Sequence, residues 1–124
     1  MELENLLVYQ LSMTLADKIW NIVTKWNTFE RMSIGGQIVR ASDSIGANIS
    51  EGFGRYNFKD SKRFLYYARG SLSETKTWLT KASNRNLIDD TEFYELIVLA
   101  KDLNIRLNNY IKSIGNTKNE FLDQ

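Results

Sequence analysis

Proline is absent from the whole chain of 124 residues, and this absence constrains the fold more than any other feature of the sequence. Proline breaks helices because it lacks a backbone donor and clashes with the preceding turn, so a chain without it can form long uninterrupted helices. Apolar residues also recur every three or four positions in four separate stretches, which is the period of a helix with one buried side. Together these features predict an all-α fold.

The first stretch differs from the others because it carries two apolar stripes. A helix buried deep in its own bundle would need both stripes, and so would a helix that packs on its own domain and also on another subunit. A chain this small offers few partners to cover one helix, which favours contact with a second subunit. One stripe contains Leu6, Tyr9, Met13, Ala16, Trp20 and Val23, and the other contains Val8, Leu11, Leu15, Ile19, Ile22 and Trp26.

Three further helices are expected after the first. The second covers about residues 33–54, where Gly46 and two nearby alanines would let a neighbouring helix approach closely. The third begins after Asn57, whose side chain suits a helix cap. The fourth begins near Asp89 or Asp90, because a carboxylate is stabilised at the positive N-terminus of a helix.

Short links between long helices force consecutive helices to lie antiparallel. The apolar fraction of 43% is enough to build a core in one domain of this length. The sequence therefore predicts an up-down-up-down antiparallel four-helix bundle over residues 1–115. The polar stretch at residues 116–124 is expected to be a mobile C-terminal tail.

Cysteine and histidine are both absent from the chain. Their absence excludes disulfides, Cys- or His-based catalytic triads, and metal or haem sites that depend on these ligands. Glu51 and Glu74 could in principle act as an acid–base pair, but no nucleophile, metal-ligand set or phosphate-binding loop accompanies them. We therefore expect no enzymatic activity and no cofactor.

The N-terminal stretch, MELENLLVYQLSMTLADKIW, has acidic residues where a signal peptide has basic ones. Asp17 and Lys18 also interrupt its apolar run well before the length of a membrane span. We therefore expect a cytoplasmic protein that makes no membrane contact.

Residues 40–55 carry a polar stripe on the second predicted helix. The spacing of its five members by four, four, three and four residues places them on one side of a helix. They are Arg40, Ser44, Asn48, Glu51 and Arg55. The run GGQIVRASDSIGANISEGFGR, with YARGSLSET on the next helix, resembles the signature of a bacterial four-helix-bundle family encoded by intervening sequences in 23S rRNA genes. The matching positions are Gln37, Arg40, Ala41, Ser44, Ile45, Asn48, Ile49, Ser50, Glu51, Gly52 and Arg55, then Ala68, Gly70, Ser71, Leu72 and Glu74.

The resemblance extends over nearly the whole chain. It implies a left-handed up-down bundle that assembles into a homopentameric ring and has no established enzymatic activity. The accessory variability protein of diversity-generating retroelements is similar, and it binds a reverse transcriptase and nucleic acid. The resemblance thus implies three kinds of partner: further copies of the chain, nucleic acid, and a protein such as a reverse transcriptase.

We interpret the polar stripe as part of a network at a helix interface, with a ligand or partner site as the alternative. Glu74 on the adjacent helix would reach Arg40 or Asn48. Glu51 would pair with Arg55 one turn away. Removing one member of a buried network leaves its partner without a counter-charge, which destabilises the fold or the assembly. The predicted network comprises Gln37, Arg40, Ser44, Asn48, Glu51, Arg55, Ser71 and Glu74.

The third predicted helix is strongly basic, although the net charge of the chain is only +1. Between Asn57 and Asn86 there are seven basic residues and two acidic ones. A solvated surface is the ordinary explanation, whereas charge gathered on one side favours nucleic-acid binding, with an aromatic ring available to stack on an unpaired base. The predicted basic face comprises Lys59, Lys62, Arg63, Tyr66, Arg69 and Lys76.

Two classes of function are compatible with these features. The first is a non-catalytic oligomeric scaffold that binds nucleic acid, with RNA favoured, through the basic face. The second is a protein-binding adaptor that makes no nucleic-acid contact. The segregation of charge favours the first class, and the near-neutral total charge favours the second.

Overall fold

The computed structural model describes residues 1–115, so the tail predicted at residues 116–124 lies outside the described residues. The described residues form five α-helices and one 3-10 helix and no strand, which confirms the predicted all-α class. The elements in chain order are η1 (Leu3–Asn5), α1 (Leu7–Val23), α2 (Thr28–Met32), α3 (Ile34–Phe53), α4 (Phe58–Asn84) and α5 (Asp90–Ser113).

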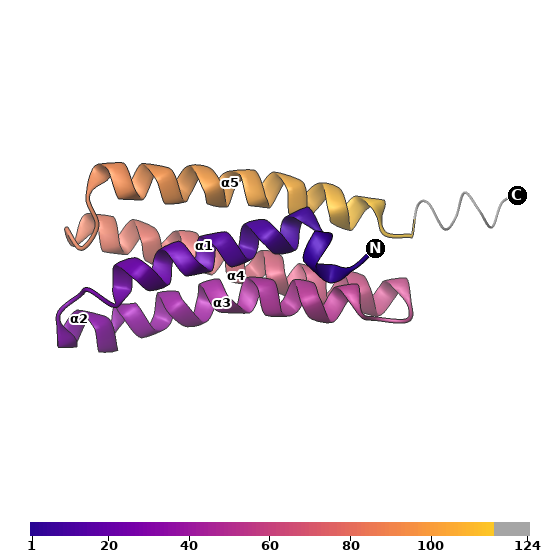
Figure 1. Cartoon of the computed structure of the whole chain (residues 1–124), viewed down its shortest axis with the longest axis horizontal. Helices are drawn as coiled ribbons and strands as arrows, with labels where there is room; N and C mark the ends of the chain where they lie inside the picture. The colour runs from indigo at the N-terminus through magenta and orange to yellow at the C-terminus, as the bar shows by residue number, and fades with distance from the viewer. Residues whose placement is uncertain (116–124) are drawn as a thin grey trace, which may run out of the picture.

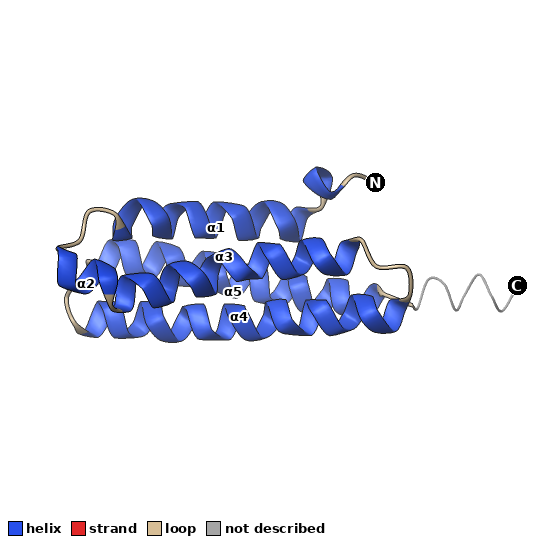
Figure 2. Ribbon diagram, turned by 90° about the horizontal axis from the view of Figure 1, so that it is seen from below, coloured by secondary structure: helices blue, strands red, loops and turns tan. Residues whose placement is uncertain are grey.

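The four long helices lie side by side in a bundle (Figures 1 and 2). α3 packs against α1 and α4, and α5 packs against α4 and α1. The link that contains α2 and the α4–α5 link lie at one end of the bundle, whereas the α3–α4 link lies at the other (Figure 1). Within residues 1–115, no helix combines the length and apolarity needed to cross a bilayer.

Side-chain caps fix the starts of α4 and α5. Asn57 Oδ1 accepts a hydrogen bond from the Asp60 backbone N (2.8 Å) at the start of α4. Asp89 and Glu92 form a reciprocal capping box at the start of α5. Such caps satisfy N–H groups that have no partner within the helix. Both predicted helix starts are confirmed.

The core contains residues of both apolar stripes of α1, because Leu6, Ala16 and Val23 of the first stripe are buried along with Val8, Leu15 and Ile19 of the second. Leu15 and Ile19 of the second stripe are each at most 1% exposed. In the first stripe, Met13 and Trp20 are 43% and 53% exposed. α1 is therefore not wedged deep within its own bundle, and an apolar part of its surface lies open in the protomer.

Two glycines of α3 allow neighbouring helices to approach closely. A Cβ atom on Gly46 would lie 2.9 Å from Ser12 Oγ of α1, which confirms the close approach predicted there. A Cβ atom on Gly52 would lie 2.9 Å from the Ser61 carbonyl oxygen of α4. Ser61 is buried, and its Oγ donates a hydrogen bond to the Gly52 carbonyl oxygen (2.8 Å). The backbones of α3 and α4 are therefore almost in contact at this point.

Candidate nucleic-acid interface

The predicted basic face lies on the outer surface of α4. Lys62, Arg69 and Lys76 recur at intervals of seven residues, so they form a row along one side of the helix with a spacing of about 10 Å. We call these three residues the α4 basic row. Of the whole predicted face, Lys59, Arg63, Tyr66 and Arg69 are exposed, and Lys62 and Lys76 are half-buried.

Arg69 shows which neighbouring helix the α4 basic row borders. Its Nη1 donates a hydrogen bond to Asn108 Oδ1 of α5 (3.0 Å). The guanidinium carbon lies 4.9 Å from the centroid of the Tyr66 ring. The row therefore runs along the α5 side of α4. Because Arg69 is already held by an amide and a ring, it loses less side-chain entropy when it binds an anion.

A hollow of about 500 Å³ lies beside the first turns of α4. Cationic and aromatic side chains line it together with one carboxylate, Asp60, which pairs with Arg63 at 3.5 Å. Arg63 and Arg55 both lie over the Phe64 ring, at 5.1 Å and 4.4 Å from its centroid. The lining residues are Lys59, Asp60, Lys62, Arg63, Tyr66 and Tyr67.

Within α4, one carboxylate lies among the residues of the α4 basic row. Glu74 is the only acidic residue between Lys62 and Lys76 in the sequence. Its Oε2 accepts a hydrogen bond from Trp78 Nε1 (2.9 Å). Among residues 1–115, neither lysine of the row makes an ion pair. Both lysines of the row are therefore free to pair with phosphate groups.

The predicted polar network forms only in part. Ser44 Oγ donates a hydrogen bond to Ser71 Oγ (2.7 Å), which links α3 to α4. Asn48 Nδ2 donates to the Ser44 carbonyl oxygen (2.9 Å). The predicted pair of Glu51 with Arg55 is present at 2.8 Å.

The charged members of the predicted network are exposed, which corrects the expectation of a buried interface within one chain. Glu74 bonds to Trp78, so it makes neither the predicted contact with Arg40 nor the one with Asn48. Arg40 and Gln37 are exposed, and within residues 1–115 Arg40 has no ion-pair partner. The reason is local: Trp78 lies one turn beyond Glu74 on the same helix and satisfies it without a cross-helix contact.

Arg40→Ala and Glu51→Ala are therefore each expected to change the free energy of unfolding of the protomer by no more than about 0.5–1 kcal/mol. Exposed ion pairs contribute little because water screens them and ordering the side chains costs entropy. Thermal melts at a protein concentration where the chain is monomeric would measure the effect. A loss of several kcal/mol in either variant would show that the exposed positions have a structural partner after all.

Asn108 is a part of the candidate interface that sequence reasoning missed. It is half-buried on α5, and its amide orients Arg69. The only signal was its place beside the core residue Leu107, because a residue next to the core stripe of a helix borders a neighbouring helix. Within the described part of the chain, no group of three or more acidic residues is arranged to hold a metal ion.

Comparison with known proteins identifies the chain's relatives. No curated protein matches the sequence. A crystal structure of a protein of unknown function from the S23 ribosomal protein family of Bacteroides thetaiotaomicron is similar, with a TM-score of 0.81 and 25% sequence identity. The similarity covers 86% of this chain and 96% of that one. The model of the 23S rRNA-intervening sequence protein family matches residues 4–109, so the chain belongs to this family, as the motif resemblance implied.

Proposed function

We propose that the protein is a non-catalytic scaffold that binds nucleic acid, with RNA favoured, through the basic face of α4. In this proposal the protomer is an up-down-up-down antiparallel bundle and assembles in the cytoplasm into a homo-oligomeric ring, with five subunits as the resemblance implies. Repetition of the basic face around a ring would let weak contacts in each subunit add up to useful affinity.

The observation that carries the proposal is the α4 basic row. Three cations lie about 10 Å apart on one side of a rigid helix, and the single carboxylate between them in sequence is bonded to Trp78. Regularly spaced cations suit a regularly charged backbone and do not require a particular base sequence. Tyr66 lies between the cations and supplies a ring for stacking on an unpaired base.

A protein-binding adaptor is the second candidate function. It is favoured by the net charge of only +1 and by exposed apolar side chains such as Trp20 and Phe29, which are 53% and 78% exposed. By analogy with the similar accessory variability protein, a reverse transcriptase is one such partner.

The parent protein is expected to bind mixed-sequence RNA in a salt-dependent manner. Each neutralised phosphate of a single strand contributes about −0.7 to the slope of log affinity against log salt, so three contacts in a subunit give a slope of about −2. Fluorescence anisotropy with a labelled RNA at about 50 and about 200 mM salt would measure this slope. If no binding occurs at the lower salt concentration, the adaptor takes the place of the RNA scaffold.

A further inference from the structure

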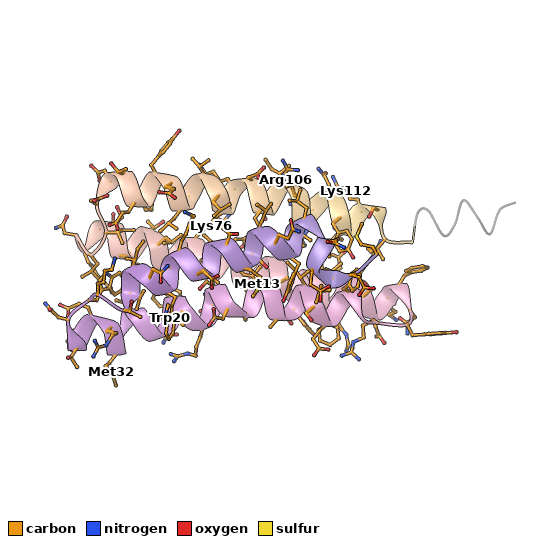
Figure 3. The ribbon with its side chains drawn as sticks, in the orientation of Figure 1. Met13, Trp20, Met32, Lys76, Arg106 and Lys112 are labelled. Atoms are coloured by element: carbon orange, nitrogen blue, oxygen red, sulfur yellow. The ribbon has the colours of Figure 1, made fainter. Side chains whose placement is uncertain are left out.

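A groove between α1 and α3 is the most distinctive surface outside the basic face. It has a volume of about 310 Å³, and its lining includes three small residues of α3, Ser42, Gly46 and Ala47. Met13 lies at its edge on α1, and Trp20 lies two turns further along the same helix. Figure 3 shows both side chains on the side of α1 that faces α3.

Two carboxylates line this groove, Asp17 from α1 and Asp43 from α3. Within residues 1–115 neither makes an ion pair. Partial burial, and then the negative charge of Asp17, raises the pKa of Asp43 above its usual value. The neighbouring cation Lys18 pairs with Glu95 of α5 at 2.8 Å and forms no ion pair with either carboxylate of the groove. Among the described residues, no cationic side chain lines the groove to stabilise these two carboxylates.

The outer surface of α5 carries a ridge with the opposite charge. Tyr94, Val98 and Ile105 are 72%, 46% and 60% exposed, and their spacing of four and seven residues places them on one side of the helix. Lys101 lies between Val98 and Ile105, is exposed, and has no ion-pair partner among residues 1–115. We call these four residues the α5 ridge.

The groove and the ridge match in spacing as well as in charge. Along α1, the apolar residues Met13 and Trp20 lie seven positions apart with Asp17 between them. Along α5, Val98 and Ile105 lie seven positions apart with Lys101 between them. Seven residues span about 10.5 Å of helix in both cases. Each apolar pair can thus face the other while the lysine meets the two carboxylates.

We propose that the α5 ridge of one copy of the chain docks into the α1/α3 groove of the next copy. This inference rests on the proposed homo-oligomer and names the surfaces that form it. Because the two surfaces differ, the contact is head-to-tail, and contacts of this kind close into rings when the rotation between copies allows it. The α4 basic row does not belong to either surface.

Charge reversal across this contact tests the inference. Lys101→Glu is expected to weaken the association constant at least about tenfold, because it places a third negative charge beside Asp17 and Asp43. Replacing Asp17 and Asp43 together by lysine should have a similar effect. Combining all three substitutions in one chain restores opposite charges and should restore assembly. Sedimentation analysis over a range of concentrations measures the association, and circular dichroism checks that each variant folds.

Lys81→Glu is the matched control, because Lys81 is an exposed lysine of α4 that belongs to neither surface. If Lys101→Glu assembles as well as the parent, or if the combined variant fails to recover, the docking inference is wrong while the homo-oligomer proposal stands. If the parent itself sediments as a 14.4 kDa monomer at every concentration, the homo-oligomer proposal fails as well.

Discussion

Replacement of Lys62, Arg69 and Lys76 together by glutamate is expected to weaken RNA binding about a hundredfold at low salt. Each lost charged contact costs roughly 1 kcal/mol of binding free energy. The slope of log affinity against log salt should become shallower by about 2, because three phosphate contacts are removed. The substitutions remove the exposed hydrogen bond of Arg69 to Asn108 but no core contact, so circular dichroism should be unchanged and the melting temperature should fall only slightly. Fluorescence anisotropy of the assembled protein would measure both the affinity and the slope.

A second triple variant controls for net charge. Lys25, Arg31 and Arg85 are exposed cations that lie outside the basic face. Their replacement by glutamate changes the net charge by the same amount but leaves the α4 basic row intact. This control should lose far less affinity than the first variant. Equal losses in both variants would show that RNA responds to total charge and that the row is not a binding surface.

Much of the fold could be predicted because helix formation is decided locally. The buried stripe of α4 contains Leu65, Leu72 and Leu79, each at most 1% exposed, and its period is plain in the sequence. Asn57 and Asp89 marked helix starts because a cap needs only a side chain and the backbone three residues away. Such short-range features require no knowledge of the neighbouring helices.

Other features depend on tertiary packing and were missed or left open. α2 is only five residues long and buries none of them, so it is too short to show a repeating apolar stripe in the sequence. The two stripes of α1 are both apolar, and only the position of α3 and α5 decides that Leu15 is buried and Trp20 is exposed. Periodicity detects an apolar side of a helix but does not rank two of them.

In the candidate site too, features within one helix could be predicted and contacts between helices could not. The basic face was predictable because all its members belong to one helix, where spacing alone fixes the side on which they lie. Its partner Asn108 was not predictable, since the register between α4 and α5 is needed to bring it to Arg69. The expected contact of Glu74 with Arg40 or Asn48 also depended on the register between two helices. Glu74 instead accepts a hydrogen bond from Trp78, which lies on the same helix.

Packing at the α3–α4 contact leads to the largest expected change in stability. Gly52→Ala should destabilise the fold by about 2 kcal/mol, or lower the melting temperature by roughly 5–10 °C. The added Cβ atom would lie 2.9 Å from the Ser61 carbonyl oxygen and 3.1 Å from Leu65 Cγ. A backbone carbonyl within α4 cannot move aside as a flexible side chain can, so the two helices must separate. Thermal and denaturant unfolding would measure the loss.

Gly70→Ala is the matched control, because it makes the same substitution at a helix position outside the Gly52–Ser61 contact. Gly70 lies within α4, and a Cβ atom there would meet nothing within 4 Å. Alanine is favoured over glycine inside a helix by roughly 0.5–1 kcal/mol, so this variant should be slightly more stable than the parent. The two alanine substitutions are therefore expected to have opposite signs. If Gly52→Ala were as stable as Gly70→Ala, the close approach of α3 to the Ser61 carbonyl would not constrain the packing of the bundle.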